Sequence, residues 1–199
     1  SDGGSLATAI AGDPYARDSH TRTGGVAFYF AGSQLEAGSF ATSYIPTAAS
    51  SVPRSADSAS MTGTDFSAWY DGTKGSFVVQ CETFTTANGG LLRGNTGNLN
   101  YKYLYKFGVL RSFNGTDVLD SVASITANST IKAALGYSAA GRSLVLNGAT
   151  AVTDASAIAT ADDTLNIGVD NTDYLNGWIS SIDYYSSRLG DSTLQSLTA

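Results

Sequence analysis

The residues best suited to chemistry are oxygen-bearing side chains beside one aromatic ring, in a short loop near the C-terminal end. Asp170, Asn171, Asp173 and Tyr174 lie within five consecutive positions. Sugars present hydroxyl edges and flat apolar faces, so carboxylate and amide oxygens beside an exposed ring form a suitable binding surface. These four residues are therefore the candidate carbohydrate-binding site. The alternative is that the Tyr174 ring packs against the end of the fold, while the acidic side chains are exposed to solvent in a turn and bind nothing.

A second acidic pair, Asp162 and Asp163, precedes this loop and suggests a metal site. Loop oxygens of Asp and Asn are the ligands that Ca²⁺ prefers. The spacing matches no EF-hand loop, and Asp and Asn are also common in turns because they bond to their own backbone. Asp162 and Asp163 are thus candidate calcium ligands, with turn formation as the competing explanation. No other cofactor is expected.

Catalytic arrangements find little support in the residue types. His20 is the only histidine, which argues against Ser-His-Asp, Cys-His and histidine-based metal sites. Glycosidases need two carboxyl groups across the scissile bond, yet the only glutamates are Glu36 and Glu82. Cys81 lies in an alternating apolar stretch and is expected to be a core side chain rather than a nucleophile. We therefore expect a protein that is not an enzyme.

The amino-acid composition restricts the possible fold classes and binding partners. The 199 residues include only 14% charged residues but 42% hydrophobic residues and 22 glycines, which is typical of a folded all-β protein with one core. The net charge of -6 argues against nucleic acid and anionic membranes, because both attract basic faces. No run of 18 apolar residues appears, so no membrane insertion is expected. A single cysteine excludes an internal disulfide and is compatible with folding in a bacterial cytoplasm.

The candidate site residues must be positioned by β-strands. The sequence predicts these strands as short stretches of alternating apolar and polar residues, separated by turn-forming residues. Asn-Gly pairs accept the positive φ angles of tight hairpin turns, and they occur at Asn114-Gly115, Asn147-Gly148 and Asn176-Gly177. The expected strands cover residues 25–30, 59–61, 75–84, 91–92, 101–107, 109–113, 118–122, 131–137, 143–146, 165–169 and 178–185. This rhythm predicts an all-β protein with an antiparallel two-sheet sandwich.

The final strand and one aromatic row carry specific expectations. Simple alternation along 178–185 places Trp178, Ile182 and Tyr184 on one face, with Ile179 and Tyr185 on the other, so both faces should be covered. The sequence also contains an aromatic knot of Phe66, Trp69 and Tyr70, for which packing is expected. The row Tyr101, Tyr103, Tyr105 and Phe107 should share one strand face, as core residues or, less favoured, as a sugar-stacking platform.

The C-terminal segment carries a family resemblance. Ser192 and Gln195 read as a capping box for a short helix, whose Leu194 and Leu197 should close one end of a sheet. The stretch LNGWISSIDYYSSRLGDSTLQSL, residues 175–197, resembles the end of the concanavalin A-like, or laminin-G-like, jelly-roll domains of bacteriophage tail and virion proteins. The stretch GSQLEAGSFATSYIPT, residues 32–47, resembles the junction that precedes such a domain.

This resemblance implies a domain organisation and a function. Residues 47–199 would form the jelly roll, and residues 1–46 would form an extended segment, the end of a preceding β module with its connector. The protein would be a non-catalytic adhesion module of a virion, made in the host cytoplasm, that binds host-surface carbohydrate. Other virion subunits would be partners, with a homotrimer preferred. The alternatives are a structural oligomerisation or decoration domain and a glycan-degrading tail enzyme.

Overall fold

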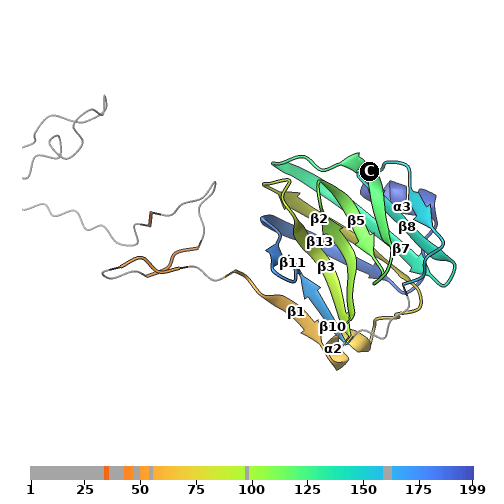
Figure 1. The fold of residues 1–199 in the computed structure, drawn as a ribbon, viewed down its shortest axis with the longest axis horizontal. Helices are drawn as coiled ribbons and strands as arrows, with labels where there is room; N and C mark the ends of the chain where they lie inside the picture. The colour runs from red at the N-terminus through yellow and green to blue at the C-terminus, as the bar shows by residue number, and fades with distance from the viewer. Residues whose placement is uncertain (1–33, 36–42, 47–49, 54–55, 97–98, 159–162) are drawn as a thin grey trace, which may run out of the picture. The chain divides into compact units, whose positions relative to one another are not determined.

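A computed structural model describes residues 34–35, 43–46, 50–53, 56–96, 99–158 and 163–199 (Figure 1). The chain divides into two units, Ser1–Arg54 and Ser55–Ala199. Within the first unit, the Ile45 backbone N–H donates to Gln34 Oε1 at 2.7 Å. The expected strand at 25–30 and His20 lie outside the described residues. The predicted boundary after residue 46 therefore stays a prediction.

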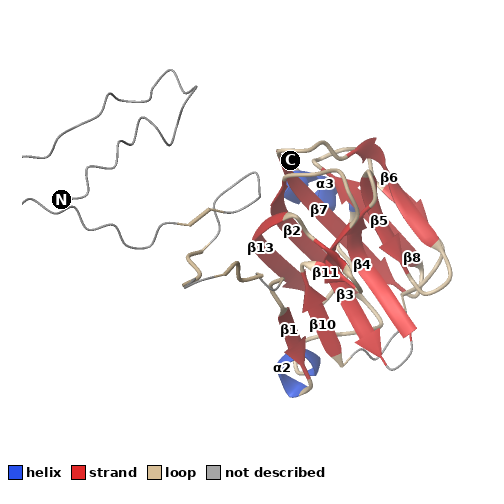
Figure 2. Cartoon of the chain, turned by 60° about the vertical axis from the view of Figure 1, so that its left-hand side comes forward, coloured by secondary structure: helices blue, strands red, loops and turns tan. Residues whose placement is uncertain are grey.

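The second unit is the predicted antiparallel β-sandwich, and the all-β expectation is confirmed (Figure 2). The six-stranded sheet runs, in spatial order, β1 (Ala59–Thr62), β10 (Thr164–Ile167), β3 (Gly89–Thr96), β4 (Leu99–Lys106), β5 (Val109–Phe113) and β6 (Val118–Ser124). The five-stranded sheet runs β13 (Gly177–Tyr185), β2 (Gly75–Thr83), β7 (Ser129–Ser138), β8 (Gly141–Leu146) and β9 (Val152–Asp154). A small hairpin of β11 (Val169–Asp170) and β12 (Asp173–Tyr174) and two helices, α2 (Thr64–Ser67) and α3 (Asp191–Thr198), complete it.

The core lies between the two sheets and follows the alternation of β2. Phe77, Val79 and Cys81 point inward and are fully buried, and each lies opposite an apolar residue of β7. Burying a large apolar side chain contributes about 1.5–3 kcal/mol, so this alternation supplies much of the drive to form the sandwich. The predicted aromatic knot also packs, because the Phe66 ring stacks on Tyr70 with 4.5 Å between centroids.

Helix α3 covers the outer face of the five-stranded sheet, not an end of it (Figure 2). Leu194 is fully buried there in a second apolar cluster with Val78, Ala134 and Val145. The predicted capping box is wrong: the helix begins at Asp191 with Gly190 as N-cap, which places Ser192 inside the first turn.

A β-bulge in β13 overturns the expected faces of that strand. Trp178 lies opposite Glu82 and Ile179 opposite Cys81, but the register then slips so that Ile182 lies opposite Val79. The extra residue brings Ile179, Ile182 and Tyr184 to the core side, whereas Trp178 points outward. Simple alternation fails here because one inserted residue exchanges the two faces.

The aromatic row of β4 is likewise not confined to one face. Tyr103 and its neighbour Leu104 are both fully buried in the core, and the register between β3 and β4 is irregular at this point. Tyr105 lies opposite Arg111, away from the core, and Phe107 follows the strand with 49% of its surface exposed. The Tyr101 side chain lies outside the described part of the chain.

The Asn147-Gly148 turn is confirmed, because the two residues have φ angles of 49° and 68°, as a type I′ turn requires. Asn114-Gly115 lies in the loop of the predicted hairpin between β5 and β6, but only Gly115 has a positive φ, of 95°. Asn176-Gly177 is not such a turn, because neither residue has a positive φ. Gly177 instead opens β13, where an added Cβ would lie 1.9 Å from the Glu82 carbonyl oxygen.

Candidate functional site

The β11–β12 hairpin carries the predicted site residues across the start of β3. The chain turns at Gly168 with φ 76° and again at Asn171 with φ 55°. A Cβ on Gly90 would lie 2.1 Å from the Val169 carbonyl carbon, and one on Gly89 would lie 3.0 Å from the Tyr174 carbonyl oxygen. Two consecutive glycines therefore let the hairpin backbone rest directly on the sheet.

The structure separates Asp170 from the other predicted sugar ligands. Its side chain is buried, and its Oδ1 lies 4.0 Å from Nε of Arg93 in β3. Asn171, Asp173 and Tyr174 are exposed. Asp170 thus anchors the hairpin to the sheet in this structure, while the exposed three remain available to a ligand.

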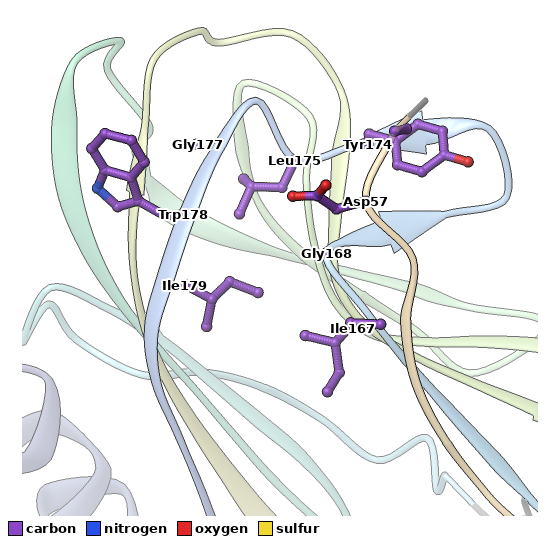
Figure 3. A pocket seen from close by; sticks show the side chains of 10 residues that line it. Asp57, Ile167, Gly168, Tyr174, Leu175, Gly177, Trp178 and Ile179 are labelled. Atoms are coloured by element: carbon purple, nitrogen blue, oxygen red, sulfur yellow. The ribbon is translucent and has the colours of Figure 1, made fainter. Parts of the chain in front are cut away.

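A pocket of about 370 Å³ opens beside Tyr174, between β13 and the strands β1 and β10 (Figure 3). Ile167, Leu175 and Ile179 form its apolar lining and also pack against the main core. Tyr174 and Trp178 lie on opposite sides in Figure 3, with 46% and 50% of their surfaces exposed. The pocket therefore combines an apolar interior with two accessible aromatic rings.

Trp178 is held in place from the neighbouring strand. Its indole Nε1 donates to Glu82 Oε2 at 2.8 Å, and its ring meets Phe84 edge to face at 4.7 Å between centroids. A ring held in this way loses little freedom when a ligand binds. Sequence reasoning missed Trp178 as a site residue, because the bulge that turns it outward leaves no mark in the apolar pattern.

Asp57 is the second residue that sequence reasoning missed. It lies two positions before β1 in a stretch rich in Ser and Ala, which reads as a plain connector. In the structure its side chain is exposed and lines the pocket between Tyr174 and Trp178 (Figure 3). Among the described residues that line this pocket, Asp57 is the only acid.

The buried Lys106 supports the loop beside Trp178. Its ammonium group donates to the carbonyl oxygens of Thr85, at 2.8 Å, and of Ala87, in the connection between β2 and β3. Burial lowers the pKa of Lys106 and raises the pKa of Cys81 to about 12. A thiol with that pKa is almost entirely protonated at neutral pH, which agrees with the expected core role of Cys81.

Asp163, one of the two predicted calcium ligands, lies far from the acidic residues of the β11–β12 hairpin. Asp163 precedes β10 and accepts the Thr164 hydroxyl at 3.1 Å, whereas Asp170 and Asp173 follow the other end of that strand. Four strand residues rise about 13 Å, which is too far for shared coordination. Within the described ranges, no group of three His, Cys, Asp or Glu side chains could hold a metal ion. Asp162 lies outside those ranges, so the calcium assignment stays a prediction.

The outer face of the six-stranded sheet carries a second polar region. Nε of Arg111 lies 2.7 Å from Asp120 Oδ1, and its guanidinium sits 4.4 Å from the centre of the Phe107 ring. Burial raises the pKa of the adjacent Tyr105. Because these charges pair with one another, the region is better explained as a stabilised sheet surface than as a ligand site.

No family model matches the chain, and no curated protein matches it by sequence. The fold is similar to solved β-sandwich structures. A Trypanosoma rangeli sialidase in complex with 2,3-difluoro-KDN matches with a TM-score of 0.55 and 13% identity, over 71% of this chain and 25% of the sialidase. The chain thus spans about a quarter of the sialidase length.

Two further likenesses cover more of the other chain. The Ruminococcus gnavus IT-sialidase CBM40 bound to alpha2,3 sialyllactose matches with a TM-score of 0.52 and 21% identity, over 64% of this chain and 83% of that one. A heptameric SAP-like pentraxin from Limulus polyphemus matches with a TM-score of 0.50 and 10% identity, over 63% and 70%. At these identities the likeness concerns the fold, and it agrees with the predicted antiparallel two-sheet jelly-roll sandwich. In the described part of the chain, no helix is both long and apolar enough to cross a membrane.

Proposed function

We propose that this chain is a non-catalytic carbohydrate-binding module of a bacteriophage virion or tail, which binds host-surface glycan at the pocket between Tyr174 and Trp178. The observation that carries the proposal is the pair of half-exposed rings flanking an apolar pocket of about 370 Å³. That volume falls within the roughly 300–1,000 Å³ typical of small-molecule sites.

The chemistry of the pocket matches the two kinds of surface on a sugar ring. The C–H faces of a pyranose pack against the rings of Tyr174 and Trp178, which bury apolar area at little cost in side-chain entropy. The hydroxyl edges meet the Asp57 carboxylate and the Tyr174 hydroxyl. This arrangement keeps Tyr174 from the predicted site and adds Asp57 and Trp178.

The resemblances support this assignment. The segment at 175–197, which resembles the end of phage virion jelly rolls, forms β13 and α3 and includes Leu175, Trp178 and Ile179 of the pocket. Among the structural neighbours, the Ruminococcus gnavus CBM40 is bound to alpha2,3 and to alpha2,6 sialyllactose, so a sandwich of this kind holds a glycan there. Attachment to a virion and a homotrimeric state belong to the same proposal, and light scattering on the intact chain tests the subunit count.

The structure favours binding over the two alternatives. Hydrolysis by the usual mechanism needs two carboxyl groups across the scissile bond, and Asp57 is the only acid among the described lining residues. The structural alternative drew on the apolar residues of both faces of the last strand. Tyr185, on the outer face of β13, packs into the cluster under α3, so a partner subunit is not needed to cover it.

Retention on immobilised bacterial polysaccharides tests the proposed function. Wild-type protein should be retained by at least one glycan, and Tyr174→Ala or Trp178→Ala should weaken that affinity by about 1–3 kcal/mol, roughly 5- to 150-fold. Phe107→Ala is the matched control, because it removes an exposed ring that does not line the pocket, and it should leave affinity unchanged. No retention of any glycan would overturn the proposal, and release of oligosaccharide would favour the enzyme alternative.

A further inference from the structure

We infer that the pocket recognises the acetamido group of an N-acetylated amino sugar. This inference rests on the proposed function, because it names the sugar substituent that the pocket between Tyr174 and Trp178 accepts. Two features of the pocket carry it. Its interior is apolar, and one of its walls is a strand edge that presents backbone N–H and C=O groups.

The apolar interior favours a methyl group over a hydroxyl group. Ile167 ends β10, Leu175 follows β12 and Ile179 lies in β13, and all three are partly buried against the main core. A hydroxyl group that entered this interior would lose water without gaining a hydrogen bond from these side chains. A methyl group buried there would instead raise the affinity roughly fourfold. The lining therefore selects a sugar that carries an apolar tip.

The backbone of β13 supplies polar groups beside this interior. The Phe84 N–H donates to the Asn176 carbonyl oxygen at 2.9 Å, which makes Asn176 a position that bonds to β2. In an antiparallel pair, such positions alternate with positions whose N–H and C=O groups point away from the neighbouring strand. Gly177 and Ile179 come one and three residues later, before the bulge, so their backbone groups point away from β2.

These groups lie at the open edge of a sheet. In the described part of the chain, β13 is the end strand of its sheet, and both Gly177 and Ile179 line the pocket. A strand edge binds an amide as one strand binds the next. The N–H and C=O of a trans amide point in opposite directions, so one acetamido group makes one such hydrogen bond with the edge. A net hydrogen bond of this kind raises the affinity roughly two- to tenfold.

An acetamido group combines the two parts. Its amide bonds to the edge of β13 and its methyl group enters the apolar interior, while the sugar ring packs between Tyr174 and Trp178 (Figure 3). A ring hydroxyl is too short to reach both parts, and a 6-deoxy sugar supplies the methyl group without the amide. The two contributions together favour the acetamido sugar over its parent hexose by roughly 10- to 40-fold.

Matched monosaccharides provide the test. The probes are N-acetylglucosamine and N-acetylgalactosamine, each compared with its N-formyl analogue and with its parent hexose, in nitrogen-15 NMR titrations of the intact chain. At least one N-acetyl sugar should bind roughly 10- to 40-fold more tightly than its parent hexose. The N-formyl analogue keeps the amide but lacks the methyl group, so it should bind about fourfold more weakly than the N-acetyl sugar.

A variant of the lining locates the methyl group. Leu175→Ala enlarges the apolar interior and should shift the preference from N-acetyl toward N-propionyl sugars. This ratio of affinities does not change if part of the sample is unfolded. Leu197→Ala is the matched control, because Leu197 is exposed on α3 and does not line the pocket, and it should leave the ratio unchanged.

Two results would overturn this inference alone: N-acetyl sugars that bind no more tightly than their parent hexoses, or an acetyl-to-propionyl ratio that Leu175→Ala leaves unaltered. Failure of every sugar and every bacterial polysaccharide to bind would instead overturn the proposed function, and the inference with it.

Discussion

Gly90→Ala tests the seating of the β11–β12 hairpin that positions Tyr174. The added Cβ would lie 2.1 Å from the Val169 carbonyl carbon, 2.3 Å from the Asp170 nitrogen and 2.4 Å from the Val169 carbonyl oxygen. All three are backbone atoms, so no side chain can rotate away. The hairpin must move by about 1.3 Å to restore ordinary van der Waals contact, or it must detach from β3.

Overpacking of this kind costs about 1–3 kcal/mol, and loss of the burial of Asp170 beside Arg93 adds to it, so we expect about 3 kcal/mol of destabilisation. For a domain of this size, that lowers the melting temperature by roughly 6–12 °C. Glycan retention should fall as well, because β12 carries Tyr174. Scanning calorimetry and the retention assay measure the two effects on the same sample.

Gly190→Ala is the control for this substitution. An added Cβ at Gly190 meets nothing within 4 Å, and the residue has an ordinary φ of -69°. Its cost should stay below about 1 kcal/mol, the scale of a changed N-cap. The reasoning is refuted if Gly90→Ala melts and binds like the wild type, since the hairpin could not then rest on β3 as described.

Three further predictions address the scaffold. Arg142→Met should lower the free energy of unfolding, measured in urea, by about 3 kcal/mol or more. The reason is that the fully buried guanidinium donates to Asp154 and to the Ser112 carbonyl oxygen. A change below about 1 kcal/mol would contradict this. Leu194→Ala should cost about 2–5 kcal/mol in the same assay, because it empties the cluster under α3; an unaffected midpoint would mean that α3 does not pack there. Cys81 should resist iodoacetamide at pH 8 in the folded protein and react fully in urea, since burial raises its pKa to about 12. The raised pKa also means that its contribution to stability is complete below about pH 8.5 and is lost as the pH rises toward 12.

The sequence predicts the sandwich well wherever a strand is regular. Phe77, Val79 and Cys81 follow an unbroken two-residue period, so their inward orientation is readable without coordinates. The same reasoning fails for Trp178 and Tyr105. The irregular register of β13 and β4 places their side chains on the sheet face opposite to the one that simple alternation predicts. Such a shift depends on how two strands pair, and the strand's own residues do not mark it.

The candidate site is predictable only in part for a related reason. Tyr174 is found because oxygen-bearing turn residues precede it, which is a local signal. Asp170 looks equivalent to Asp173 in sequence, but Arg93 and the glycines of a distant strand decide that it is buried. Asp57 joins the site because the two sheet edges lie close together, and this depends on the topology of the whole domain.

The chain contains two tryptophans, which allows one measurement to locate the ligand directly. The Trp178 indole N–H donates to Glu82 at the pocket, and the indole N–H of Trp69, in the aromatic knot, donates to the Asp65 carbonyl oxygen at 2.8 Å. In nitrogen-15 NMR spectra each gives one indole signal, which Trp178→Phe assigns. Titration with a retained oligosaccharide should shift the Trp178 signal saturably and leave the Trp69 signal in place. A saturable shift of Trp69 alone, or binding that moves neither signal, would contradict a glycan site between Tyr174 and Trp178.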